Sequence, residues 1–202
     1  HIRPLTQSLE DFKLDSSKLL DELMNELDIS NPGYRAPCFS LDNERLEILK
    51  ELDFSYDSSK ISAGFHPLYG SIILDGYKKI RNNVYVNKKF TEFQLPTQTF
   101  FNKNIPISGG GYLRILPWFF YKYLLKKYLK ENDTYFFFIH PFELTNKKIK
   151  LPNDASMISK LRFKIGRSIA STRFKKLIRI LKKEGFEFLT FSEFNREINK
   201  NA

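Results

Sequence analysis

The chain is poor in several residues and patterns that mark particular classes of protein. Cys38 is the single cysteine in 202 residues, which excludes a disulfide scaffold. No apolar run approaches the roughly 18 residues of a membrane-spanning helix, because Lys122 closes the run Ile115–Tyr121 and His140 interrupts Thr134–Phe142. A phosphate-binding glycine loop, a nucleophilic serine elbow and a CxxC pair are all missing. Cys38 is therefore expected to be a buried free thiol rather than a nucleophile.

Acidic residues are scarce relative to basic ones. Asp and Glu number 23 and Lys and Arg 33, which gives a formal net charge of +10. The segment Lys160–Lys183 holds ten basic residues and no acidic one, so the whole excess is local. Such a stripe can meet phosphate, an acidic glycan or an anionic membrane surface. Its apolar residues recur at helical spacing, so the simpler interpretation is a solvated helix face, and no nucleic-acid partner is expected.

Aromatic residues, in contrast, are abundant. The sequence contains 20 Phe, 10 Tyr and one Trp, and 42% of its residues are hydrophobic. This content excludes a disordered chain and is sufficient for a sizeable core at this length. So many aromatic side chains cannot all bind a ligand, and most of them are expected in the core.

The first 57 residues alternate between helical and extended patterns. Ser8 predicts the start of an amphipathic helix, and Ser40 or Asp42 is expected to cap a second one. Short strands are predicted at Tyr34–Ala36 and Phe54–Tyr56. This order of helix, strand, helix and strand predicts an α/β protein with a parallel sheet.

The rest of the chain carries one strong strand pattern and several weaker ones. Tyr135–Ile139 is apolar on both faces, as a central buried strand is. Strands are also expected at Phe90–Leu95 and Phe186–Thr190. Ser108–Gly111 predicts a flexible turn, and Pro117 predicts the first turn of a helix.

Few residues are candidates for chemistry. Of the three histidines, His1, His66 and His140, the last closes the strongest predicted strand, where α/β proteins place active-site residues. His66 lies in a loop and is interpreted as structural or exposed. Arg35 is a charge inside an extended run and is costly to bury without a partner, for which Asp57 is the expected candidate. This arrangement is typical of a site, but the spacing does not name a reaction.

Five short motifs, taken together and in order, resemble a known family. The motifs are GYRAPCFS at 33–40, FSYDSS at 54–59, EFQLP at 92–96, GGGYLR at 109–114 and HPFEL at 140–144. They resemble motifs of the polysaccharide deacetylases of the NodB-homology type, or carbohydrate esterase family four. The closer resemblance is to the subgroup found in bacterial exopolysaccharide loci.

The resemblance implies an α/β fold, a deformed (β/α) barrel of the NodB-homology type, as one domain over residues 1–202. Residues 1–144 would form the barrel part, and residues 145–202 would complete it with the basic helix and a final strand and helix. The first motif of the family has no counterpart in this sequence. The barrel is therefore expected to be N-terminally incomplete, and the chain to be the C-terminal two-thirds of a deacetylase.

The resemblance also implies a reaction, the hydrolysis of N-acetyl groups on a sugar polymer. In the family a divalent metal, usually zinc, polarises the acetyl carbonyl and the attacking water. Carried over to this sequence, Arg35 is the arginine that orients the base, Asp57 is its neighbour, and His140 is the general acid. His1 falls where the second metal-binding histidine would be. The base Asp, the metal Asp and the first metal His have no counterpart.

Substrate and partners follow from the same resemblance. Tyr34, Pro37, Tyr112 and Arg114 are the expected substrate-binding residues, and the substrate is an N-acetylated polysaccharide in exopolysaccharide biosynthesis. Association with a membrane-bound polysaccharide synthesis machinery is implied, and the cysteine content suits either the cytoplasm or the cell envelope. Two alternatives stay open. One is an inactive glycan-binding relative, and the other is a basic nucleic-acid or membrane-surface binder acting through Lys160–Lys183.

Overall fold

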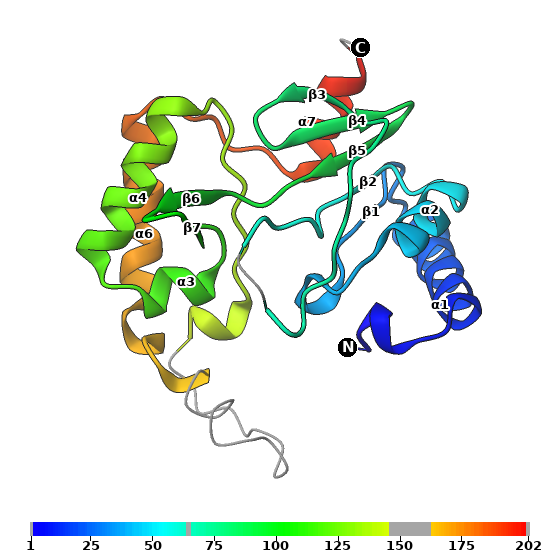
Figure 1. Ribbon diagram of the computed structural model, residues 1–202, viewed down its shortest axis with the longest axis horizontal. Helices are drawn as coiled ribbons and strands as arrows, with labels where there is room; N and C mark the ends of the chain where they lie inside the picture. Colours follow the sequence, from blue (N-terminus) through cyan, green and yellow to red (C-terminus); the bar gives the residue numbers. More distant parts are fainter. Residues whose placement is uncertain (1, 64–65, 146–162, 201–202) are drawn as a thin grey trace.

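The computed structural model describes residues 2–63, 66–145 and 163–200 (Figure 1). Its α-helices are α1 (Leu9–Asp21), α2 (Asn43–Glu51), α3 (Gly110–Ile115), α4 (Trp118–Glu131), α6 (Arg167–Lys183) and α7 (Phe191–Lys200). Its strands are β1 (Gly33–Tyr34), β2 (Tyr56–Asp57), β3 (Lys78–Arg81), β4 (Val84–Asn87), β5 (Phe90–Phe93), β6 (Thr97–Phe100) and β7 (Lys103–Pro106). Short turns of 3₁₀ or π helix lie at Pro4–Thr6, Glu22–Glu26, Pro37–Phe39 and Pro141–Glu143.

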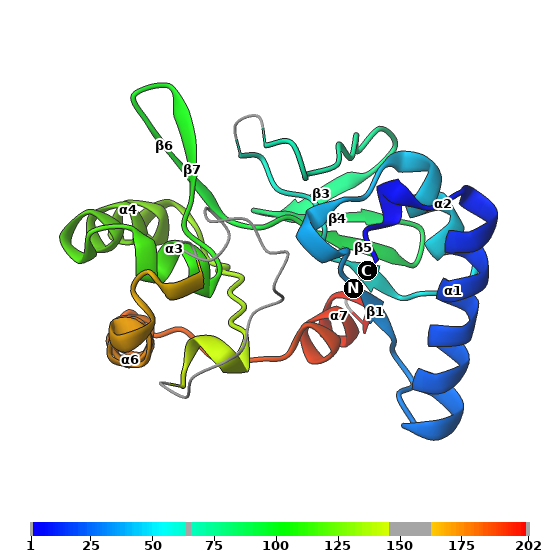
Figure 2. The ribbon, with the colours of Figure 1, turned by 90° about the horizontal axis from the view of Figure 1, so that it is seen from below.

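These elements form two halves that lie side by side (Figure 1). The sheet half contains a five-stranded sheet together with α1, α2 and α7. The helical half contains α3, α4, α6 and the hairpin β6–β7, which extends away from the helices in Figure 2. No helix of the described residues is both long enough and apolar enough to span a bilayer.

The five-stranded sheet has the order β1-β2-β5-β4-β3. Strands β1, β2 and β5 are parallel, whereas β4 and β3 continue the sheet in antiparallel fashion. The predicted parallel rhythm is therefore confirmed for the first strands, and the molecule is a mixed α/β protein. The described residues neither close a barrel nor exclude one, so the barrel remains a prediction.

Helices cover both faces of this sheet because their apolar sides match it. Phe12 of α1 and Leu46 and Leu49 of α2 are buried against one face. On the other face, Ile198 of α7 is buried in a cluster with Phe93. The predicted caps of α1 and α2 are confirmed, since Ser8 Oγ accepts from the backbone of Asp11 and Asp42 Oδ1 accepts from that of Arg45, each at 3.0 Å.

The helical half is built on α4 and α6. Helix α4 begins directly after Pro117, as predicted, and buries Leu124 and Leu125. Leu177 and Leu181 of α6 pack in the same cluster. The lysines of α6 and Arg179 are exposed and form a solvated helix face, whereas Arg167 and Arg173 are half-buried and donate to backbone carbonyl oxygens. Residues 160–162 of the basic segment lie outside the described residues.

The strongest predicted strand, Tyr135–Ile139, is not a strand. The segment is extended and runs between the two halves in Figure 1, but no described strand lies alongside to form a ladder with it. Its side chains alternate between the halves. Tyr135 and Phe137 pack in the cluster of the helical half, and Phe136 and Phe138 pack in that of the sheet half. The side chains of this segment alternate as they do in a β-strand, but no described strand forms a ladder of hydrogen bonds with it.

Four other expectations need correction. Phe186–Thr190 is an irregular connection between α6 and α7, because no described strand pairs with it. Ser108–Gly111 is only partly a turn, since α3 starts at Gly110. Cys38 is exposed rather than buried, because Cys38 and Phe39 both have φ of 55° and this backbone turns the thiol outward. β2 also starts two residues later than predicted, at Tyr56.

Two glycines with positive φ offer a matched test of how α6 is attached. A Cβ at Gly166 would lie 2.2 Å from the carbonyl oxygen of Arg114, whereas a Cβ at Gly185 meets no atom within 4 Å. Gly185→Ala should cost about 1 kcal/mol for the left-handed backbone alone. Gly166→Ala should cost about 1–3 kcal/mol more, because α6 must move away from α3. Urea unfolding of the two variants measures this difference, and equal losses would contradict the close packing of Gly166.

Candidate functional site

The candidate site begins with a row of three residues across the parallel strands. Strand register pairs Tyr34 with Asp57, and Asp57 with Glu92. Partners in register point to the same face of a sheet, and the Tyr34 ring packs between Phe12 and Phe54 on the side covered by α1 and α2. Two carboxyl groups are thereby held next to each other under an apolar layer, and both are fully buried.

Nearby hydrogen bonds satisfy most of the Asp57 and Glu92 oxygens. Ser59 donates to Asp57 from its backbone N and from its hydroxyl, each at 2.8 Å, and the backbone N of Lys60 donates to Glu92 Oε1 at 2.9 Å. Glu92 Oε2 receives no bond from an N–H or hydroxyl donor of the described residues.

Electrostatics favours the protonated form of this pair. Burial raises the pKa of Glu92 well above its ordinary value of 4.5, and the negative charge of Asp57 raises it further. Burial also raises the pKa of Asp57, whereas the hydrogen bonds from Glu92 and Ser59 lower it. The two carboxyl groups therefore titrate as one coupled pair and not as two independent acids.

Arg35 follows β1 and lies beside this pair without a direct ion pair to it. Its Nε donates to the carbonyl oxygen of Ser58 at 3.0 Å, and its Nη2 donates to the Ser58 hydroxyl at 2.8 Å. Burial lowers the pKa of Arg35, and the charge of Asp57 opposes that effect. The expected proximity of Arg35 and Asp57 is thus found, but the bonds of Arg35 go to Ser58, and no ion pair among the described residues joins Arg35 to Asp57.

The Arg35 guanidinium makes cation–π contacts with two aromatic rings. Its Cζ lies 4.9 Å from the ring centre of Phe138 and 5.0 Å from that of Phe191. Each contact with a desolvated cation contributes on the order of 1 kcal/mol. Phe138 also makes an edge contact with His140, with ring centres 5.9 Å apart. Arg35 and His140 therefore contact the same ring from segments that are far apart in the sequence.

His140 is held by a buried ion pair behind it. Glu143 Oε2 lies 3.2 Å from His140 Nδ1 and accepts from the His140 backbone N at 3.1 Å. Arg114 Nε donates to Glu143 Oε1 at 2.9 Å. The His140 side chain is 59% exposed, whereas that of Glu143 is 3% exposed. The His140 ring is thus open to solvent, whereas Glu143 and Arg114 behind it are held inside the protein.

The expected substrate-binding residues lie in different surroundings. Tyr34 is packed among aromatic rings, and Pro37 starts the 3₁₀ turn that carries the exposed Cys38. The hydroxyl of Tyr112 lies 3.3 Å from that of Tyr69, whose ring is stacked on His66. Tyr112 and Pro37 are half-buried, and substrate contact by either residue remains a prediction.

Arg114, the fourth expected substrate-binding residue, is committed inside the protein. Besides Glu143, its guanidinium binds the carbonyl oxygen of Ile165 at 2.5 Å. Only 8% of the Arg114 side chain is exposed. Substrate contact by Arg114 remains a prediction, but these bonds favour a role in holding Glu143.

The described residues do not fit a metal ion at this site. The residues searched contain no group of three His, Cys, Asp or Glu that could hold one. Asp57 and Glu92, the acids at the strand ends, are buried against each other and present no open face. His1, the predicted metal ligand, lies outside the described residues.

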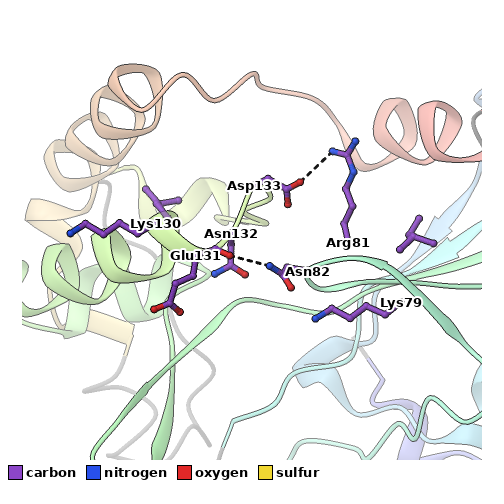
Figure 3. A pocket seen from close by; sticks show the side chains of 9 residues that line it. Lys79, Arg81, Asn82, Lys130, Glu131, Asn132 and Asp133 are labelled. Carbon is purple, nitrogen blue, oxygen red and sulfur yellow. Dashed lines mark hydrogen bonds and ion pairs between the residues drawn. The ribbon is translucent and has the colours of Figure 1, made fainter.

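A separate hollow lies where the turn between β3 and β4 meets the end of α4 (Figure 3). Arg81 and Asp133 face each other across it at 3.9 Å, and Asn82 donates to the carbonyl oxygen of Glu131 at 3.2 Å. The described residues that line it include none of the predicted site residues. These contacts join the sheet half to the helical half.

Sequence reasoning missed four residues that complete the site. Glu92 and Glu143 both lie inside motifs that the sequence analysis named. Glu92 is a charge in a predicted strand, and Glu143 is three residues from His140, so both positions could have been recognised from the sequence. Phe138 lies in a run of aromatic residues that all appeared to be core. Phe191 carries no local signal, because its contact with Arg35 depends on how α7 packs.

The fold and the site define a mixed α/β protein with a buried acid pair, a clamped arginine and an exposed histidine. The chain belongs to the family described as a domain of unknown function, DUF3473, whose model matches residues 58–195. Comparison with curated proteins and with solved structures finds no match to the chain.

The acid pair makes stability depend on pH in a stated direction. A glutamate whose pKa is raised on folding stabilises the native state below its ordinary pKa, and this contribution is lost as pH rises toward the raised value. Glu92→Gln keeps the size and a donor toward Asp57 but removes the titrating group. We expect the free energy of unfolding of Glu92→Gln, relative to wild type, to increase as the pH rises above the ordinary glutamate pKa of 4.5.

Urea unfolding at several pH values measures this difference. The exposed Glu187 provides the control, since Glu187→Gln should leave a difference that is flat with pH. Parallel curves for Glu92→Gln and wild type would show that Glu92 is ionised in the folded protein.

Proposed function

We propose that this chain is the arginine- and histidine-bearing part of a metal-dependent polysaccharide de-N-acetylase, in keeping with its resemblance to the NodB-homology type. The observation that supports the proposal best is the convergence of three separate motifs. Arg35 and His140 come from different segments and contact the same ring, that of Phe138, and the charge of Asp57 acts on Arg35. The proposed substrate is an N-acetylated polysaccharide of an exopolysaccharide pathway.

The reaction requires a proton at a defined atom. Water adds to the acetyl carbonyl carbon, the C–N bond breaks, and acetate and a free amine result. The departing nitrogen must gain a proton as the bond breaks. We assign this proton to His140, whose ring is more than half exposed beside the clamped Arg35.

Arg35 and Asp57 have supporting roles in this proposal. The two aromatic rings and Ser58 restrict the guanidinium to one position, so that its charge faces a fixed direction. Asp57 keeps a negative charge next to that guanidinium and offsets part of the cost of burying it. Arg35 is thereby prepared to orient the carboxylate that acts as the base in the family.

The proposed metal, a divalent ion and usually zinc in the family, supplies polarisation of the acetyl carbonyl and of water. The described residues do not form its site, and the roles proposed here are those of the chain's own side chains. Acetylated glycan, rather than metal, is what Tyr112 and Pro37 would contact.

Acetate release by the full-length protein tests the proposal. With zinc, cobalt or nickel present, we expect release from an N-acetylated glycan, and His140→Ala should lower kcat by about 10²-fold or more. Arg35→Ala should lower it as well, whereas Arg179→Ala, at an exposed arginine of α6, should leave it unchanged.

The proposal is wrong if no acetate appears from any N-acetylated glycan with any of the three metals. Binding of the glycan without acetate release would instead support the glycan-binding alternative. Circular dichroism of each variant shows whether a lost activity reflects a lost fold.

A further inference from the structure

The surroundings of His140 contain a buried ion pair that the proposed reaction does not itself require. Glu143 and Arg114 are both buried, at 3% and 8% side-chain exposure, and are 2.9 Å apart. Arg114 also donates to the carbonyl oxygen of Ile165. The pair therefore joins α3, the turn Pro141–Glu143 and the residues just before α6. A buried pair of this kind contributes little net stability, so its position next to His140 needs another explanation.

The contacts around Glu143 favour one assignment for the His140 ring. The backbone N of Glu143 donates to the His140 carbonyl oxygen at 2.9 Å, and the same N–H also faces the His140 side chain in the capping turn. The Nδ1 atom lies 3.2 Å from Glu143 Oε2, and a carboxylate paired with arginine can only accept. A hydrogen on Nδ1 makes this contact favourable, whereas a lone pair there would face the carboxylate oxygen.

We propose that Glu143 is a positioning residue that fixes the tautomer of His140, with Nδ1–H directed at its carboxylate and Nε2 left for a partner outside the protein. The hydrogen bond that one ring nitrogen makes decides which tautomer a histidine adopts. The assignment to a proton transfer rests on the proposed function, whereas the tautomer does not. In that transfer Nε2 first takes a proton from solvent and then gives it to the amide nitrogen as the C–N bond breaks, and the ring returns to its neutral form with the hydrogen on Nδ1 directed at Glu143.

Among the residues that the structure describes, the other groups near the ring do not compete for Nδ1. Phe142 is stacked on the ring with centres 5.3 Å apart, and Phe138 meets it edge-on. Arg114 lies behind Glu143, and Arg35 lies across the Phe138 ring. The two arginines are donors only, so neither can accept the Nδ1 hydrogen.

Gly110 adds a packing constraint to the same carboxylate. A Cβ at Gly110 would lie 2.3 Å from Glu143 Oε2, whereas a Cβ at the neighbouring Gly111 meets no atom within 4 Å. The missing side chain at Gly110 is what lets the carboxylate lie between Arg114 and His140. Gly110→Ala and Gly111→Ala thus form a matched pair in which only the first disturbs Glu143.

Nitrogen-15 NMR of the His140 ring tests the proposal without any substrate. In the wild-type chain with the ring neutral, we expect hydrogen on Nδ1 and a lone pair on Nε2. In Glu143→Gln, Arg114 Nε–H should hold the amide oxygen and turn the amide NH2 toward Nδ1, so the hydrogen should move to Nε2. Gly110→Ala should give a mixture of both tautomers, and Gly111→Ala should match wild type.

The signals are assigned by their loss in His140→Gln, and circular dichroism reports whether each variant is folded. A wild-type ring with its hydrogen on Nε2 would overturn the proposal, even if Glu143→Gln failed to fold. An unchanged tautomer in a folded Glu143→Gln would overturn it as well. Since the measurement needs no turnover, a failure of the deacetylase proposal would leave this result standing. If acetate release is found, Glu143→Gln should lower kcat and leave KM little changed.

Discussion

The extended segment 135–139 decides how the two halves of the molecule meet. Because its side chains alternate, Tyr135 and Phe137 enter the helical core while Phe136 and Phe138 enter the sheet core. A one-residue shift along this segment would exchange the two sets. Phe138 would then leave Arg35, and His140, two residues further on, would turn away from the sheet. The relative placement of arginine and histidine therefore depends on the packing of an aromatic segment that belongs to both cores.

Buried charge at the site is handled in two different ways. Burial raises the pKa values of both Asp57 and Glu92, so the pair reduces the cost of two desolvated anions by favouring its protonated form. Glu143 instead has a fixed cation, Arg114, at 2.9 Å and lies 3.2 Å from the His140 ring. The charge of the first arrangement, beside Arg35, depends on pH. The second places an arginine-paired acid behind a ring at the surface.

The sequence predicted well those features that depend on a few neighbouring residues. The caps at Ser8 and Asp42 and the helix after Pro117 are local, and the structure confirms them. The segment 135–139 was wrongly predicted as a strand, because a ladder needs a second chain segment that no local pattern reveals. Arg35 was expected to pair with Asp57, but the alternation of side chains along adjacent strands directs it to Ser58 and to the rings of Phe138 and Phe191. Individual residues of the site could thus be predicted from the sequence, whereas the contacts between them could not, because those contacts depend on how distant segments pack.

The match to the family of unknown function does not cover a self-contained site. Residues 58–195 include Glu92, the Arg114–Glu143 pair, His140 and Phe191, but Arg35 and Asp57 precede them. Strands β1 and β2 also precede the match, although β2 hydrogen-bonds to β5 inside it. Without β2, Glu92 would lose its acidic neighbour Asp57, and without the residues that follow β1, Phe138 and Phe191 would lose the guanidinium of Arg35. The matched region is therefore a structural part of a larger unit, and its histidine acquires an arginine partner only when the preceding strands complete the sheet.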